Sequence, residues 1–114
     1  MTGSSGHLGE ALMRVLPGDG HEMIGLDLLA SPHTSLPGSV ADRGTVRGCV
    51  AGVDAVVHSA TLHKPHVGTH DRAQFVETNI TGTLILLEEA GRAGVRAFGV
   101  RLLSAALRLG PWAG

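Results

Sequence analysis

A glycine-rich turn at residues 2–9, Thr-Gly-Ser-Ser-Gly-His-Leu-Gly, constrains the fold of this chain more than any other feature. A helical pattern of apolar residues, Leu8, Leu12, Val15 and Leu16, follows it at once. Glycines allow close approach to the backbone, and the free N–H groups at a helix start point toward an anion. The turn therefore predicts a phosphate site formed by Gly3, Ser5, Gly6, His7, Leu8 and Gly9. A tight turn that only packs the helix closely is the alternative.

The first strand of the expected sheet is largely missing. A turn of this kind normally follows a hydrophobic strand, yet only Met1 and Thr2 precede Gly3. Because the first strand is central in such a sheet, its loss leaves two strands without a shared neighbour. Unpaired buried main-chain groups cost ~1–3 kcal/mol each. We therefore expect a truncated product that is marginally stable, aggregation-prone or dependent on a partner.

Composition limits the chain to one small domain of 114 residues with a net charge of −1. Without a basic surplus, neither nucleic acid nor an anionic membrane is an expected partner. The sequence shows no apolar run of ~20 residues and no signal peptide. Cys49 is the only cysteine, so we expect a core residue, no internal disulfide and a cytoplasmic setting.

Hydrophobic patterns predict an alternation of helices and strands. Helices are expected over 7–16 and 43–51 and from Asp71 to Arg92, with Gly94 ending the last one. Strands are expected over 21–27, 54–58 and 95–100, with a very short piece at 39–42, and loops over 30–38 and 60–70. This order predicts an α/β fold with a parallel sheet and flanking helices.

Asp27 closes the second strand about 20 residues after the glycines, where a carboxylate can accept hydrogen bonds from an adenosine ribose. Leu28 and Leu29 follow it, so a 2′-phosphate would meet a negative charge and no guanidinium. This favours NAD over NADP. Asp42 is placed to reach the adenine edge, to cap the helix that follows, or to do both. A solvated strand end is the alternative for Asp27.

Together these segments resemble the extended short-chain dehydrogenase/reductase family of NAD(P)-dependent epimerases, dehydratases and reductases. The resemblance covers residues 1–97 and rests on the glycine turn, Asp27, Ala41-Asp42, Val57-His58-Ser59-Ala60 and Thr78-Asn79-Ile80-Thr81-Gly82-Thr83. It implies a Rossmann fold whose glycine turn holds pyrophosphate, with Asp27 on the ribose and the adenine near Val40 and Asp42. It also implies that Ser59, Ala60 and Thr61 line the nicotinamide side and that Asn79 supports the active site through its backbone.

The chain departs from that family in its catalytic residues and its tail. The family uses a Tyr-x-x-x-Lys pair with a nearby Ser or Thr, but this chain has no tyrosine. Lys64 lies in a loop and does not match the pair, and the flanks of Ser104 do not support it as the family serine. Residues 98–114 form an unmatched tail. We therefore expect a partial NAD-binding domain in residues 1–97, without catalysis of its own. A non-catalytic NAD-binding module or partner subunit, and a non-functional fragment, are the alternatives.

Two further segments carry open interpretations. His63, His66 and His70 lie in the loop after His58, where three imidazoles can bind zinc. A polar loop without metal is the preferred interpretation. If the loop is functional, Thr61 to His66 are expected near the substrate, which would be sugar-like in a full-length parent. The stripe of the long helix, Phe75, Val76, Ile80, Leu84, Leu87 and Ala90, is expected to pack on the sheet. The resemblance also implies a homodimer through helix 71–92.

Overall fold

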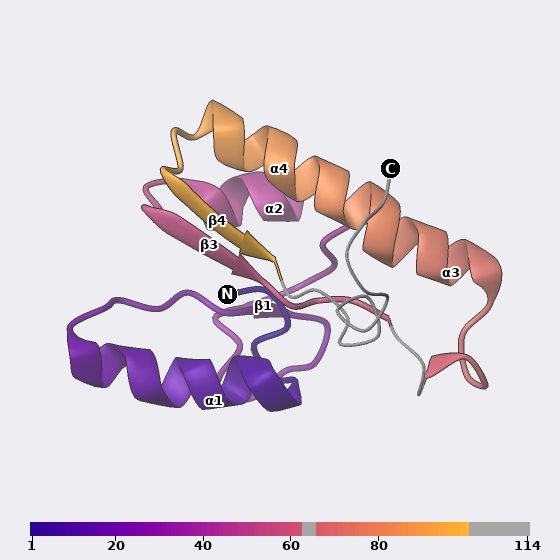
Figure 1. Ribbon diagram of the computed structural model, residues 1–114, viewed down its shortest axis with the longest axis horizontal. Coiled ribbons are helices and arrows are strands. Elements are labelled where there is room, and N and C mark those ends of the chain that lie inside the picture. The colour runs from indigo at the N-terminus through magenta and orange to yellow at the C-terminus, as the bar shows by residue number, and fades with distance from the viewer. Residues whose placement is uncertain (63–65, 101–114) are drawn as a thin grey trace, which may run out of the picture.

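The computed structural model describes residues 1–62 and 66–100. Within them, helices α1 and α2 and the strands β1 to β3 come first, and the helices α3 and α4 and the strand β4 follow (Figure 1). In chain order, their bounds are α1 His7–Val15, β1 Leu26–Asp27, β2 Leu36–Pro37, α2 Arg43–Val50, β3 Ala55–His58, α3 Arg72–Val76, α4 Gly82–Arg92 and β4 Ala97–Val100. A 3-10 turn, Leu16–Asp19, extends α1, and a π-helical turn, Glu77–Thr81, joins α3 to α4.

Thr2 occupies the central position of the parallel sheet. β1 pairs with β2 and β3 pairs with β4, both in parallel, and Thr2 forms parallel bridges to Leu26 and His58. The order across the sheet is therefore β2, β1, Thr2, β3, β4. The Thr2 N–H donates to the Val57 carbonyl at 3.0 Å, and the Leu26 N–H donates to the Met1 carbonyl at 2.9 Å. At the level of Thr2, the neighbouring strands therefore keep a shared partner, contrary to the expectation.

Two expected strands differ from the structure. The strand expected over 21–27 is shorter in the structure, where β1 consists of Leu26–Asp27 and pairs with β2 and with Thr2. The piece expected at 39–42 is not a strand, and β2 lies instead in the expected loop. Pro37 is tolerated there because β2 is an edge strand, where a missing N–H costs no ladder bond.

The core lies between the sheet and the helices α2 and α4, while α1 covers the opposite face of the sheet (Figure 1). Cys49 is buried in this core, as expected. The other buried apolar residues of the core are Leu26, Val40, Val46, Val50, Val56, Ile85, Leu86 and Ala90. The described residues include no helix with the length and apolar character needed to cross a membrane.

The segment from Arg72 to Arg92 is helical throughout, but most of the expected stripe does not face the core, and Ala90 is the member that is buried there. Asp71 caps it through a reciprocal capping box with Gln74, and Gly94 follows its end with φ of +75°. Ile85, Leu86 and Ala90 face the core. The expected stripe is largely exposed, at 50% for Val76, 63% for Ile80, 53% for Leu84 and 47% for Leu87. Apolar residues occupy two faces of this helix, so periodicity alone does not select the packed one.

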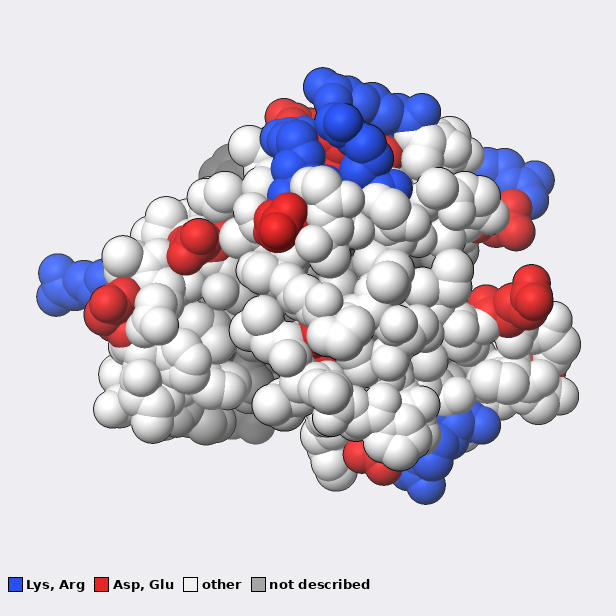
Figure 2. All heavy atoms as spheres, turned by 180° about the vertical axis from the view of Figure 1, so that it is seen from behind, with Lys and Arg blue, Asp and Glu red and all other residues white. Residues whose placement is uncertain are grey.

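Glu89 is the only acidic side chain buried among the described residues, and three arginines surround it. Its carboxylate accepts hydrogen bonds from Arg43 Nη1 at 2.8 Å, Arg47 Nε at 3.0 Å and Arg92 Nη1 at 3.1 Å. Figure 2 shows basic side chains gathered around acidic ones at the top of the molecule. Hydrogen bonds first from Arg47 and then from Arg43 lower the pKa of Glu89 to about 2. This cluster ties α2 to α4.

We predict that Glu89→Gln lowers the free energy of unfolding at pH 7. In this variant the free energy of unfolding should also fall less steeply as pH drops from 4.5 toward 2. Because the folded pKa lies below the ordinary 4.5, the contribution of Glu89 is complete above pH 4.5 and is lost as pH falls toward 2. Urea unfolding followed by circular dichroism at several pH values measures both effects. Glu88→Gln is the matched control, because the exposed Glu88 contacts Arg43 alone. The prediction would be contradicted if the wild type and Glu89→Gln lost the same free energy of unfolding as pH falls from 4.5 toward 2.

Candidate functional site

A cavity of about 620 Å³ lies at the carboxyl ends of the parallel strands, between the glycine turn and the segment after β3. This is where open α/β sheets bind ligands. Eleven of the thirteen residues predicted from the sequence line the cavity: Gly3, Ser5, Gly6, His7, Leu8, Gly9, Asp27, Val40, Ser59, Ala60 and Thr61. The other two, Asp42 and Asn79, lie outside its lining.

Glycine occupies each of the three positions of the turn for a different steric reason. Gly3 has φ of +68°, and a Cβ on it would lie 2.8 Å from Ser59 Oγ. A Cβ on Gly9 would lie 1.8 Å from the Gly3 carbonyl oxygen, so close packing of α1 on the turn requires glycine there. A Cβ on Gly6 would meet only that same oxygen, at 3.3 Å. Packing therefore explains Gly3 and Gly9, whereas at Gly6 the missing Cβ mainly leaves space in the cavity.

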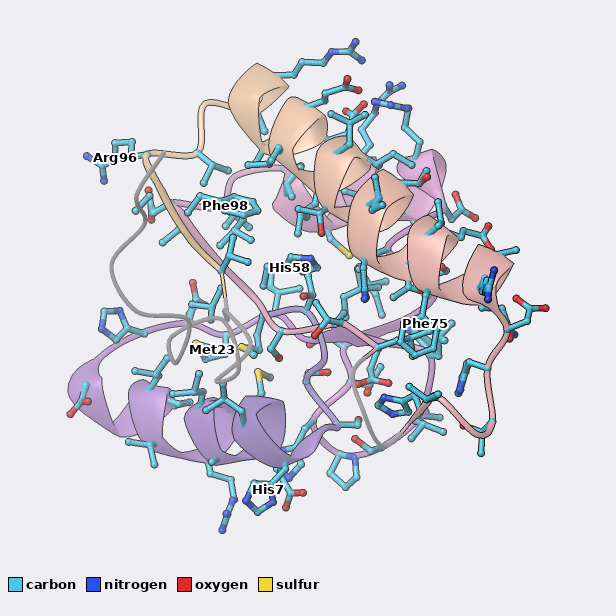
Figure 3. The ribbon with its side chains drawn as sticks, turned by 45° about the vertical axis from the view of Figure 1, so that its right-hand side comes forward. His7, Met23, His58, Phe75, Arg96 and Phe98 are labelled. Atoms are coloured by element: carbon cyan, nitrogen blue, oxygen red, sulfur yellow. The ribbon has the colours of Figure 1, made fainter. Side chains whose placement is uncertain are left out.

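The start of α1 presents main-chain N–H groups to the cavity. Gly6 is its N-cap, and no side chain caps the helix. Because the first N–H groups of a helix have no partner within it, they form a site for an anion. The His7 side chain is exposed and points away from the sheet (Figure 3), so we expect the backbone of His7 to face a ligand.

Asp27 connects the end of β1 to the glycine turn. Its Oδ2 accepts a hydrogen bond from the Ser5 N–H at 2.9 Å, and its Oδ1 accepts one from the Leu29 N–H at 2.9 Å. A carboxylate has about four lone-pair positions, so it can still accept from the two hydroxyls of a ribose. The Ser5 hydroxyl lies beside those of Ser31 and Thr34. These two hydroxyls are part of the site's surroundings that the sequence pattern did not indicate.

Helix capping and contact with adenine were both left open for Asp42, and the structure shows the cap. Its Oδ1 accepts a hydrogen bond from the Thr45 N–H at 3.2 Å, at the start of α2. Gly38, Ser39 and Val40, which precede Asp42 in the chain, line the cavity. Because Asp42 lies outside this lining, the structure gives no support to a contact between Asp42 and adenine.

Asn79 acts on the cavity indirectly and through its side chain, where the resemblance had implied its backbone. Its Oδ1 accepts a hydrogen bond from the Leu62 N–H, and its Nδ2 donates to the Leu62 carbonyl, both at 2.7 Å. Leu62 follows Thr61 in the cavity wall. Asn79 lies in the π-helical turn, a feature frequent at functional sites. Three more wall residues missed by sequence reasoning, Gln74, Glu77 and Thr78, lie on one helix face at spacings of three and four.

His58 and Thr2 fix the end of β3 that leads into the cavity. Thr2 Oγ1 accepts from the Ser59 and Ala60 N–H groups, both at 3.1 Å, and lies 2.6 Å from His58 Nδ1. With two donors already on it, Thr2 Oγ1 must donate its own proton, so His58 Nδ1 is the acceptor. The proton of the ring then lies on Nε2, which donates to Thr83 Oγ1 at 2.9 Å. The neutral imidazole thus joins the centre of the sheet to α4.

We predict that the free energy of unfolding falls below about pH 6.5 because of His58. Burial lowers the pKa of His58, so the unfolded chain binds a proton that the folded chain excludes. Stability is therefore retained at neutral pH and lost as pH drops below the unfolded pKa, with a slope of at most ~1.4 kcal/mol per pH unit. Urea unfolding from pH 8 to pH 5 tests this. His58→Gln should be less stable at pH 8 but lack this slope; an unchanged slope would refute the assignment.

Two histidines of the loop after β3 contribute to the cavity wall. His66 and His70 line the cavity, and their ring centroids lie 5.4 Å apart at an interplanar angle of 89°. Across residues 1–62 and 66–100, no group of three potential ligands is placed to hold a metal ion. His63 and Lys64 lie outside the described residues, as does Ser104.

The sequence pattern of the NAD dependent epimerase/dehydratase family matches residues 1–106. This chain belongs to that family. Sterol demethylase protein B of Methylococcus capsulatus is 34% identical over 106 residues, which cover 84% of this chain and 31% of that protein. UDP-glucose 4-epimerase of Erwinia amylovora is 29% identical, over 86% of this chain and 34% of the relative.

A solved structure shares the fold as well. A short-chain dehydrogenase/reductase superfamily protein from Agrobacterium tumefaciens with bound NAD superposes with a TM-score of 0.78 at 32% identity. The match covers 87% of this chain and 30% of that protein. The expected Rossmann-type α/β fold is thus confirmed, as is the family. The chain spans about a third of the length of the relatives it matches.

Proposed function

We propose that the chain is an NAD-binding unit of an NAD-dependent epimerase, dehydratase or reductase, and that NAD binds in the cavity described above. The observation that carries this proposal is the space beside Gly6, at the uncapped start of α1, where a Cβ would fill the cradle. The pyrophosphate would lie against the N–H groups of the turn and of α1. The adenine would lie near Val40, and the nicotinamide near Ser59, Ala60 and Thr61.

The choice of NAD over NADP rests on Asp27. Its carboxylate faces the cavity from the end of β1, and a ribose 2′-phosphate beside it would meet like charge. The described lining of the cavity contains no arginine or lysine that would compensate such a phosphate. A ribose with free hydroxyls can instead donate to the lone pairs that the Ser5 and Leu29 amides leave open.

The reaction of the complete enzyme requires groups that this chain lacks. Bound NAD supplies the hydride acceptor, but the family's proton transfer uses a tyrosine, and the sequence contains none. We therefore propose that residues 1–97 bind the cofactor without turnover; β4 runs across that boundary to Val100. A non-catalytic NAD-binding module is favoured by the same observation. A sugar-like substrate of a complete enzyme would lie at the His66 and His70 end, because two relatives are epimerases of UDP-glucose.

We predict that the chain binds NAD more tightly than NADP and that Gly6→Ala weakens NAD binding at least ~tenfold, since the new methyl group occupies the cradle. Thermal melts and isothermal titration calorimetry with both cofactors measure this, because a ligand specific for the folded state raises the melting temperature. Gly48→Ala is the control, since its Cβ meets no atom within 4 Å. A cooperative melt that neither cofactor raises would contradict the proposal.

We also propose that the exposed stripe of the long helix, Val76, Ile80, Leu84 and Leu87, forms the interface of a homodimer. These side chains lie along one helix face and are each about half exposed or more, outside the core that α4 forms with the sheet. Contiguous exposed apolar surface of this kind marks an association site. A pair of such faces would close as a bundle of helices from two copies.

For the dimer, the expected result is that Leu84→Glu converts it to a monomer in sedimentation equilibrium, since a buried carboxylate without a partner is costly. Val15→Glu is the matched control, because Val15 is 61% exposed on α1, on the opposite side of the sheet. It should leave the assembly unchanged. A wild-type chain that stays monomeric at high concentration would refute this interface.

A further inference from the structure

A buried network of hydrogen bonds connects α4 to the wall of the cofactor cavity. His58 points from β3 toward α4 (Figure 3), where its Nε2 lies 2.9 Å from Thr83 Oγ1. On the other side of the ring, Nδ1 lies 2.6 Å from Thr2 Oγ1. That oxygen also accepts the N–H groups of Ser59 and Ala60, which line the cavity. We call Thr2, His58 and Thr83 the buried network, and the two lining residues the Ser59–Ala60 wall.

The Thr2 hydroxyl has no hydrogen-bonding capacity left over. A hydroxyl group has one proton to donate and two lone pairs that accept. The two amides of the Ser59–Ala60 wall use both lone pairs, so the proton is donated to His58 Nδ1. The ring proton of a neutral His58 then lies on Nε2 and is donated to Thr83. The buried network is therefore complete for only one tautomer of the neutral imidazole.

Protonation of His58 breaks this arrangement. A second proton on the ring converts Nδ1 from an acceptor into a donor, and Thr2 Oγ1 has no free lone pair to receive it. His58 and Thr2 are 0% and 3% exposed, so solvent does not supply another acceptor. Because a buried charged donor without a partner is costly, Thr2 Oγ1 would accept from the imidazolium and give up one of its amides. The Ser59–Ala60 wall then loses one of the bonds that hold it.

The surroundings of His58 are uncharged in the part of the chain that the structure describes. Its ring contacts the hydroxyls of Thr2 and Thr83, and the Phe98 ring on β4 lies 6.4 Å away between centroids. Burial lowers the pKa of His58, and no neighbouring charge adds to the shift. Because the folded pKa lies below the ordinary 6.5, the buried network is complete at neutral pH and is disrupted as pH falls through that lower pKa.

Thr83 determines which nitrogen of His58 carries the proton. Its hydroxyl oxygen is the acceptor that the Nε2–H group meets on α4. Without that oxygen, the Nε2–H group would be buried without a partner, and the tautomer with its proton on Nδ1 would compete. That tautomer directs a donor at Thr2, as the imidazolium does. Thr83 lies outside the described lining of the cavity, yet it acts on the Ser59–Ala60 wall through His58.

We propose that Thr83 is a positioning residue for the nicotinamide half of NAD. By holding His58 in its neutral Nε2–H tautomer, Thr83 keeps both lone pairs of Thr2 Oγ1 for the Ser59–Ala60 wall. Protonation of His58, or loss of the Thr83 hydroxyl, loosens this wall and weakens binding of that half of the cofactor. The inference rests on the proposed function, in which the nicotinamide lies near this wall. ADP lacks the nicotinamide half, so its binding should change little.

The test measures the affinities of NAD, NADH and ADP for the full chain by isothermal titration calorimetry from pH 8 to pH 5. We expect the ratio of NAD affinity to ADP affinity to fall as pH drops through the folded pKa of His58, by up to ~tenfold per pH unit. The ratio removes effects on the adenosine half, such as protonation of Asp27, and ADP binding reports that the chain stays folded. NADH, whose dihydronicotinamide is uncharged, should give the same profile as NAD.

Variants of the buried network test the role of Thr83 directly. Thr83→Val keeps the shape of the side chain but removes the acceptor, and it should lower the NAD-to-ADP ratio at pH 8 by about threefold or more. Thr83→Ser should restore the ratio, because the hydroxyl is retained. His58→Gln takes up no proton, so its ratio should not depend on pH. Thr81→Val is the matched control, since Thr81 is exposed on the preceding turn, and it should leave the ratio unchanged.

The inference is overturned if NAD and ADP affinities fall in parallel, because the buried network would then only stabilise the fold. It is also overturned if NAD responds to pH and NADH does not, since the imidazolium would then simply repel the charged nicotinamide ring. Failure of Thr83→Ser to restore the ratio would contradict the role of the hydroxyl. If neither NAD nor ADP binds at pH 8, the proposed function itself fails, whereas a ratio that stays constant with pH contradicts this inference alone.

Discussion

The parallel bridges made by Thr2 are the constraint on which the rest of this structure depends. A parallel sheet of this kind needs a central strand, because its neighbours on both sides direct N–H and C=O groups toward it. Here Thr2 meets that need at one level, with bridges to Leu26 and His58, and the main chains of Met1 and Gly3 add hydrogen bonds to Leu26. The Thr2 hydroxyl adds contacts to the Ser59 and Ala60 amides and to His58. The glycine turn then begins at the next residue, so the same point orders the sheet and the cofactor cavity.

Most of the residues predicted to bind the cofactor line the cavity, because each part of the cavity has a local signal in the sequence. Glycine spacing, the acid after β1 and the small residues after β3 are all properties of short segments, and the parallel topology brings them to one edge. Asp42 shows where such local signals are ambiguous. A carboxylate before a helix serves equally as a cap or as a ligand group, and only the position of the adjacent Ser39 and Val40 in the cavity wall separates the two.

Longer-range features were predictable only in part. The helix from Arg72 to Arg92 has clear start and stop signals, yet its packed face was not identified. Glu89 is buried on that face because Arg43 and Arg47, more than forty residues earlier, supply the opposite charges. No pattern within the helix reveals such partners. Likewise, β2 forms around Pro37 because the edge of the sheet is available there, which is a property of the assembled sheet and not of the segment.

The bonds of Thr2 also mean that the two ends of the cofactor cavity are mechanically one unit. One end of the cavity begins at Gly3, and the Ser59–Ala60 end is held by the hydroxyl of Thr2, the residue just before Gly3. Ordering one end therefore restricts the motion of the other without any change of shape. Fragments such as the adenosine half and the nicotinamide half of a dinucleotide would pay this ordering entropy once between them, so occupancy of one half favours occupancy of the other.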